Sequence, residues 1–255
     1  MVRLCWLGLH LMLGLVLAAS VFRWGSRSRQ ERTLSWWSAR LLRILRVQLI
    51  IRGGPPQPNG GGLVIASNHI SWLDVFVIHA LRPARFVAKS EIRSWPVLGW
   101  LAAQTGTLFI ERGRRHHTAK INEAMRDTLM QGHCVALFPE ATTTRGDHLK
   151  KFHSSLLESV VASGATLACV GICYKRQDGE KTEVTAFVDD LTLLASLRQI
   201  LRQPRMIAEI HCGPVLTSIG KTRRELALEA EVAIASLLGL PTPHRKPETA
   251  AGLAA

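Results

Sequence analysis

The first 22 residues place the strongest constraint on how this chain folds, because they contain an apolar run whose exposure to water is unfavourable. Residues 4–22 are interrupted by only two clearly polar side chains, His10 and Ser20. The length of this run is close to the roughly 20 residues that a helix needs to cross a bilayer. We therefore expect an N-terminal helix that is associated with a membrane.

Basic residues flank this run, mostly on its C-terminal side. One arginine precedes it, and four follow it closely: Arg23, Arg27, Arg29 and Arg32. A cleavable signal peptide has the opposite order, so we expect a retained anchor. If the helix spans, the heavier positive flank faces the cytoplasm, which places the rest of the chain on the cytoplasmic side of an inner membrane. A cleaved signal peptide and a helix lying in one leaflet are the alternatives.

Residues 33–51 form a second pattern, with apolar side chains on one arc of a helix and arginines on the opposite arc. The apolar arc comprises Trp37, Leu41, Leu42, Ile44, Leu45 and Leu49. We predict an interfacial helix whose arginines face lipid headgroups. The alternative is a surface helix packed on the protein core. Residues 1–52 would then form the membrane-associated helical part of the chain.

Residues 53–62 are rich in Pro and Gly and predict a linker. After it, apolar runs alternate with helical patterns, which predicts an α/β domain over residues 53–240 with a mainly parallel sheet flanked by helices. Residues 241–255 are expected to be a disordered tail. The expected strands are residues 63–66, 84–88, 107–110, 134–138, 167–174, 183–188 and 207–212. The expected helices are residues 71–81, 118–131, 152–163 and 222–238.

The charge balance implies an anionic partner. The chain has 32 Lys and Arg against 19 Asp and Glu, a net charge of +13. With one tyrosine in all and basic residues close to the apolar run, membrane lipids fit better than nucleic acid. The five cysteines are scattered, and their spacing fits neither a zinc site nor a disulfide framework.

The first chemical motif is Asn68-His69-Ile70-Ser71-Trp72-Leu73-Asp74, at the expected junction between a strand and a helix. If His69 precedes the first helical turn, its ring can fold back toward Asp74. A carboxylate on one imidazole nitrogen fixes the tautomer and leaves the other nitrogen able to accept a proton. The motif therefore indicates a general base with its orienting group. The alternative is a helix cap beside a surface carboxylate.

Two further motifs follow strands. The first runs from Gly106 to Arg112, whose guanidinium is suited to a bidentate grip on phosphate. The second is Phe138-Pro139-Glu140-Ala141-Thr142-Thr143-Thr144-Arg145, where a carboxylate and hydroxyls follow an apolar strand. A solvated basic turn and a Thr-capped turn are the alternative interpretations.

Together these motifs resemble the phospholipid and glycerol acyltransferase family, above all its bacterial 1-acylglycerol-3-phosphate acyltransferases. The family's Asn-His-x4-Asp, Gly-x-x-Phe-Ile-x-Arg and Phe-Pro-Glu-Gly-Thr blocks fall on residues 68–74, 106–112 and 138–142. Residues 89–99 also look like the family. Two departures are Ala141 in place of the usual Gly, and residues 168–172, which lack the proline of the family's fourth block.

The resemblance implies transfer of an acyl group from a coenzyme A or acyl carrier protein thioester to the sn-2 hydroxyl of 1-acylglycerol-3-phosphate. His69 would be the base and Asp74 its orienting group, with no metal or bound cofactor. The residues expected to bind substrate are Asn68, Ser71, Gly106, Arg112, Glu140, Ala141 and Thr142. The alternatives are acylation of another lysolipid, such as lyso-ornithine lipid, and a non-catalytic lipid-binding protein on the same fold.

Overall fold

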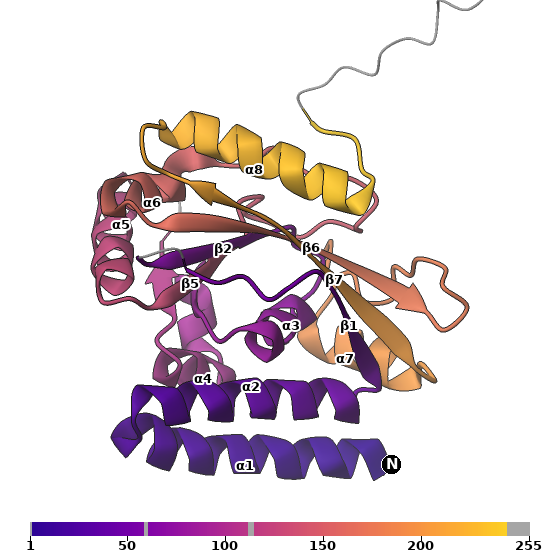
Figure 1. Cartoon of the computed structure of the whole chain (residues 1–255). Helices are drawn as coiled ribbons and strands as arrows, with labels where there is room; N and C mark the ends of the chain where they lie inside the picture. The colour runs from indigo at the N-terminus through magenta and orange to yellow at the C-terminus, as the bar shows by residue number, and fades with distance from the viewer. Residues whose placement is uncertain (1, 59–60, 112–114, 244–255) are drawn as a thin grey trace, which may run out of the picture.

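A seven-stranded β-sheet lies at the centre of the protein, with helices on both faces (Figure 1). The computed structural model describes residues 2–58, 61–111 and 115–243, with only the backbone of residues 115–118. The strand order is β1-β7-β6-β2-β5-β3-β4, and every neighbouring pair is parallel except β6 with β7. The predicted α/β fold with a mainly parallel sheet is confirmed.

The elements have the following bounds. The strands are β1 (Val47–Arg52), β2 (Leu63–Ser67), β3 (Arg85–Lys89), β4 (Leu108–Ile110), β5 (Cys134–Leu137), β6 (Thr166–Arg176) and β7 (Met206–Thr217). The α-helices are α1 (Val2–Trp24), α2 (Arg27–Ile44), α3 (Leu73–Leu81), α4 (Leu98–Gln104), α5 (Arg115–Met130), α6 (Glu158–Ser163), α7 (Leu193–Arg202) and α8 (Arg223–Leu238). Two short 3₁₀ helices are η1 (Ser90–Ser94) and η2 (Ser154–Leu157).

The central strands are buried on both faces, as expected for a parallel sheet covered by helices. All five residues of β2 are buried. One core contains Leu42, Leu73 and Ile172, from α2, α3 and β6. The other contains Leu157 and Ile234 and lies under α5, α6 and α8. Burial of such side chains, at about 1.5–3 kcal/mol each, fixes which face of each strand meets which helices.

The predicted strand at residues 183–188 is wrong. This segment is a loop between β6 and α7, and no helix was predicted over the residues that form α7. The segment has the residue pattern of a partly buried strand, and Thr185 and Ala186 are indeed buried in the structure. Its hydrogen bonds, however, run to other loops: the N–H of Phe187 donates to the carbonyl of Ile70 at 2.8 Å.

The prediction of an interfacial helix over residues 33–51 is also wrong. The helix ends at Ile44, the chain turns at Arg46 with a φ of +59°, and β1 then pairs in parallel with β7. The apolar arc, including Trp37 and Leu41, packs into the protein core. Residues 47–52 therefore belong to the sheet, and α2 is a helix packed on the core.

The first helix, α1, lies lengthwise against α2 on the outside of the protein (Figure 1). Its buried residues, Leu7, His10, Gly14 and Ala18, form one helical stripe. His10 and Trp37 exchange two hydrogen bonds: Nε2 of His10 lies 2.9 Å from the Trp37 carbonyl, and the indole N–H donates to the His10 carbonyl at 3.1 Å. These contacts hold α1 parallel to the surface of the domain.

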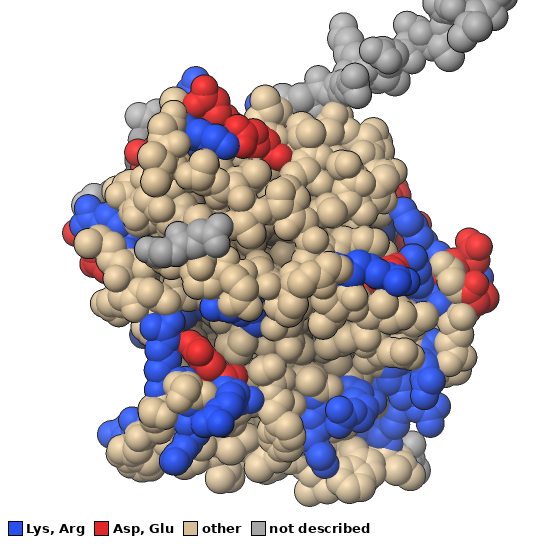
Figure 2. Space-filling view, in the orientation of Figure 1, with Lys and Arg blue, Asp and Glu red and all other residues tan. Residues whose placement is uncertain are grey.

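The opposite face of α1 is apolar and uncovered. Its exposed large side chains are Val2, Leu4, Trp6, Leu9, Met12, Leu13, Val16 and Trp24. By length and composition, α1 could cross a membrane. Figure 2 shows Lys and Arg side chains gathered at both ends of the layer formed by α1 and α2. An apolar face with a cationic border is the pattern of a helix that binds an anionic bilayer.

We predict that replacing Leu4, Leu9 and Val16 together by Gln releases the purified protein from anionic vesicles. The side chains are 59%, 63% and 63% exposed, so the unfolding midpoint should change little. Binding to sedimented vesicles should fall at least tenfold, because each buried apolar side chain contributes roughly 1.5 kcal/mol or more. The control is the pair Leu194→Gln and Ile219→Gln, which are 76% and 75% exposed elsewhere. Equal loss in the control would contradict a role for α1.

Candidate functional site

The candidate site forms where β2 ends and α3 begins. His69 lies two residues after β2, and Asp74 lies in the first turn of α3. This is the carboxyl edge of the parallel strands, where α/β sheets commonly build sites. The segment between the two residues turns so that their side chains meet, as the sequence predicts.

The carboxylate of Asp74 is fully buried and binds four donors. Its Oδ2 lies 2.9 Å from Nδ1 of His69 and accepts the backbone N–H groups of Ile70 at 2.7 Å and Ser71 at 2.9 Å. Its Oδ1 accepts the hydroxyl of Tyr174 at 2.7 Å. Since two N–H groups already donate to Oδ2, this oxygen is an acceptor, and Nδ1 of His69 carries the proton. The other ring nitrogen, Nε2, is then the basic one.

The imidazole ring of His69 stacks on Phe138, the residue that follows β5. The ring centroids are 3.8 Å apart and the planes differ by 6°. The His69 side chain is 20% exposed. No residue that the structure describes makes a hydrogen bond to Nε2. The ring is therefore fixed on one side by Asp74 and on one face by Phe138, with its basic nitrogen left for another molecule.

Glu140 holds the main chain of His69 in place. It is buried, and its two oxygens accept the backbone N–H groups of His69 and Lys150, each at 2.8 Å. Burial raises the pKa of the Glu140 carboxyl, while these backbone hydrogen bonds oppose the rise. The N–H of Thr144 donates to the His69 carbonyl at 2.8 Å. Glu140 thus joins the loop after β5 to the backbone of His69.

The neighbouring residues of this loop differ in their surroundings. Ala141, at the position where the family has Gly, has a φ of +59°, a left-handed conformation that costs a non-glycine residue about 1–2 kcal/mol. Thr142 is exposed. Gly146, with a φ of +82°, lies so close to Ile70 that a Cβ would stand 2.7 Å from its Cδ1. The loop therefore packs directly on the segment that carries His69.

Asn68 and Ser71 are buried and bonded within the protein. The Asn68 amide donates to the Ile172 carbonyl at 2.9 Å and accepts the Ile172 N–H at 2.8 Å, which continues the pairing of β2 with β6. The hydroxyl of Ser71 accepts the N–H of Leu73 at 3.3 Å. Both residues shape the turn around His69, because their polar groups face the protein's own backbone.

The second motif lies partly outside the described residues. Gly106 has a φ of +77° and packs against Arg85, whose side chain a Cβ would meet at 3.0 Å. Arg112, the predicted phosphate ligand, lies outside the residues that the structure describes.

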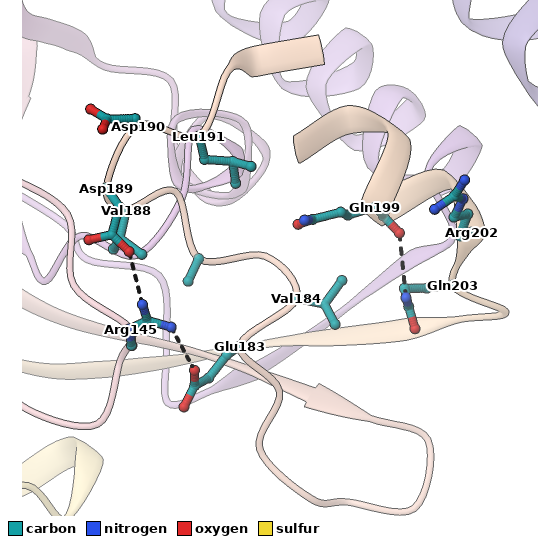
Figure 3. A pocket seen from close by; sticks show the side chains of 11 residues that line it. Arg145, Glu183, Val184, Val188, Asp189, Asp190, Leu191, Gln199, Arg202 and Gln203 are labelled. Carbon is teal, nitrogen blue, oxygen red and sulfur yellow. Dashed lines mark hydrogen bonds and ion pairs between the residues drawn. The ribbon is translucent and has the colours of Figure 1, made fainter. Parts of the chain in front are cut away.

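A cavity of about 760 Å³ lies between the loop after β6 and α7, with Arg145 on its wall (Figure 3). Its walls carry both charges. Arg145 donates to Glu183 at 3.2 Å and to Asp189 at 2.9 Å. Asp190 lies on the same side as this pair, whereas Arg202 lies on α7 at the other side. The loop reaches the segment that carries His69 through the hydrogen bond of Phe187 to Ile70.

One group among the described residues has the spacing of metal ligands: Cys173, Glu209 and His211. The Glu209 carboxylate, however, already binds the ammonium of Lys175 and, at 2.8 Å, the guanidinium of Arg52. These two cations lower the pKa of Glu209 to about 2. Burial raises the pKa of the Cys173 thiol, which disfavours the thiolate that a metal needs. We therefore assign the group as an ion-pair network.

Sequence reasoning missed Tyr174 and the stacking role of Phe138. Tyr174 lies on β6, a hundred residues from Asp74 in sequence, and only the pairing of β6 with β2 brings the two together. One signal was available. A tyrosine inside an apolar strand needs a partner for its hydroxyl once it is buried.

Comparisons with known proteins point to one family. The Acyltransferase family model matches residues 48–173, which include all three motifs. The lyso-ornithine lipid O-acyltransferase of Pseudomonas aeruginosa is 37% identical, over 84% of this chain and 81% of that protein. The 1-acyl-sn-glycerol-3-phosphate acyltransferase of Neisseria gonorrhoeae is 41% identical, over 54% of this chain and 53% of that protein.

The fold also matches a solved structure. The 1-acyl-sn-glycerophosphate acyltransferase PlsC of Thermotoga maritima superposes with a TM-score of 0.66, covering 93% of this chain and 96% of that one at 16% identity. At this identity the likeness concerns the fold alone, while the 37% identity over most of both chains is a family relationship. The chain belongs to the acyltransferase family.

Proposed function

We propose that the protein transfers a fatty acyl group from a coenzyme A or acyl carrier protein thioester to the hydroxyl of a lysolipid, with His69 as general base. The observation that carries the proposal is the set of hydrogen bonds at Asp74, which puts the ring proton on Nδ1 and leaves Nε2 basic. Among the described residues, no side-chain nucleophile makes a hydrogen bond to Nε2 of His69, which suits direct attack by the acceptor hydroxyl.

In this reaction the acceptor oxygen attacks the thioester carbonyl carbon while Nε2 of His69 takes the hydroxyl proton. The tetrahedral intermediate collapses, the carbon–sulfur bond breaks, and the imidazolium returns the proton to the leaving thiolate. The products are an ester and a thiol. Asp74 orients the ring and stabilises the imidazolium that forms between the two proton transfers.

We propose that α1 seats the enzyme on the cytoplasmic face of the inner membrane. Because α1 packs along α2, a bilayer that covers its outer apolar face would lie alongside the domain. A lysolipid could then reach His69 without leaving the membrane surface. If α1 instead spans the bilayer, the excess of arginine after it supports the cytoplasmic side.

Two acceptors are candidates. Similarity over most of the chain to a lyso-ornithine lipid O-acyltransferase favours lyso-ornithine lipid. An ornithine headgroup carries an ammonium group and a carboxylate, which suit the Asp190 and Arg202 sides of the cavity in Figure 3. Arg112 in the second motif supports 1-acylglycerol-3-phosphate, the acceptor of the second candidate function.

The dyad is tested by single substitutions. We expect His69→Ala to lower acyl transfer by about 10²–10⁴-fold, because the base is removed. Asp74→Asn should be nearly as severe, since an amide can hold the other tautomer. Acyl transfer to a panel of lysolipids is measured alongside the unfolding midpoint, and the exposed His153→Ala serves as control. Substantial activity in correctly folded His69→Ala protein would refute the mechanism.

The acceptor is tested by three variants, two at Arg112 and one at Asp190, each assayed on both lysolipids. If the acceptor is 1-acylglycerol-3-phosphate, Arg112→Lys should raise its KM and Arg112→Ala should raise it further, by roughly 10- to 150-fold for a contact worth ~1.5–3 kcal/mol. If the acceptor is lyso-ornithine lipid, Asp190→Asn should raise its KM and Arg112→Ala should have little effect. The lysolipid with the higher wild-type kcat/KM is taken as the acceptor, and the variants expected to raise its KM must do so. If they do not, the assignment of Arg112 or Asp190 to acceptor binding is wrong.

A further inference from the structure

We propose that Tyr174 is a positioning residue that tunes the basicity of His69 through Asp74. The proposal rests on the general-base role proposed above. Tyr174 lies on β6, it is 2% exposed, and its hydroxyl donates to Oδ1 of Asp74 at 2.7 Å. Among the described residues, it is the only donor to this oxygen.

The two oxygens of Asp74 are thereby divided between two tasks. Oδ2 receives His69 and the backbone of Ile70 and Ser71, whereas Oδ1 receives Tyr174. A buried carboxylate oxygen without a donor would carry an uncompensated charge. The hydroxyl of Tyr174 supplies the missing donor and fixes the rotation of the carboxylate, so that Oδ2 stays in line with Nδ1.

The phenol is held in the donating form. Burial, together with the negative charge of Asp74 and its hydrogen bond, raises the pKa of Tyr174 well above its ordinary value. Tyr174 therefore keeps its proton and donates a hydrogen bond to Asp74 at neutral pH. Its bond draws charge away from the side of the carboxylate that faces His69, and so sets how strongly Asp74 stabilises the imidazolium.

The backbone of β6 reinforces this arrangement. Asn68 binds both polar groups of Ile172, two residues before Tyr174 on the same face of the strand. Strand β6 thus binds Asn68 through the backbone of Ile172, and it binds the carboxylate of Asp74 through the hydroxyl of Tyr174. Placement of the dyad depends on β6 as well as on the turn that carries the motif.

The composition of the chain allows an unusually clean test, because Tyr174 is its single tyrosine. Biosynthetic replacement of tyrosine by 3-fluorotyrosine changes only this residue, and fluorine makes the phenol a stronger donor. Tyr174→Phe removes the donor. The matched control is Ser38→Ala, which deletes another fully buried hydroxyl, one without a hydrogen-bond partner among the described residues.

The pH profile of kcat/KM is the readout, since its acidic limb reports the free enzyme's base. Within the described part of the chain, the other titratable groups around the dyad are Glu140, which binds the His69 backbone, His148, which faces Glu140, and Cys173 beside Tyr174. None of these changes in the variants. A shift of the acidic limb therefore reports the bond between Tyr174 and Asp74.

With Tyr174→Phe, Asp74 stabilises the imidazolium more strongly, so the acidic limb should move to higher pH. The carboxylate also loses the bond that fixes its rotation toward Nδ1, so kcat should fall about tenfold. KM values should not change, because Tyr174 is 2% exposed. The 3-fluorotyrosine enzyme should shift its limb to lower pH. Its single ¹⁹F resonance should move in Asp74→Asn but not in Ser38→Ala protein.

Coincident acidic limbs for the wild-type, Phe and fluorotyrosine enzymes would overturn the proposal. If Tyr174→Phe fails to fold, the fluorotyrosine enzyme carries the test alone. The general-base function is tested separately, because an active His69→Ala enzyme would refute it. If His69→Ala is inactive but the acidic limbs of the Tyr174→Phe and fluorotyrosine enzymes do not move, only the role of Tyr174 is refuted.

Discussion

The buried carboxylate of Asp74 is the interaction on which the site depends. Four donors from two parts of the chain meet at its two oxygens, and removal of any one would leave buried charge uncompensated. The same bonds determine the turn between β2 and α3, the tautomer of His69 and the contact with β6. The same carboxylate therefore stabilises the local fold and orients the base, so a substitution at Asp74 affects both stability and activity.

Much of this arrangement could be predicted from sequence because it is local. The five-residue spacing between His69 and Asp74 places both in one turn, and the apolar runs of β2, β5 and β6 identify buried parallel strands. The sequence-based predictions were wrong or incomplete where residues far apart in the sequence determine the structure. Residues 183–188 look like a strand but bond to other loops, and Tyr174 reaches Asp74 only through the strand order.

The N-terminal region shows the same limit. An amphipathic arc alone does not say whether lipid or protein covers it, and the arc of α2 is covered by the sheet and α3. The apolar surface left over lies on α1, whose inner stripe binds α2 through His10 and Trp37. Glu140, Asn68 and Ser71, for which substrate binding stays a prediction, hold the backbone around His69. A motif therefore records positioning residues as well as those that face a ligand.

The tautomer of His69 decides whether Nε2 can act as the base. Nitrogen NMR of ¹⁵N-histidine-labelled protein in detergent micelles distinguishes protonated from unprotonated ring nitrogens, and the His69→Ala variant identifies the signals. At a pH where the ring is neutral, we expect a protonated Nδ1 and an unprotonated Nε2 for His69. A proton on Nε2 with Nδ1 bare would contradict it, because the hydrogen bond to Asp74 would then be absent and no base would face the acceptor.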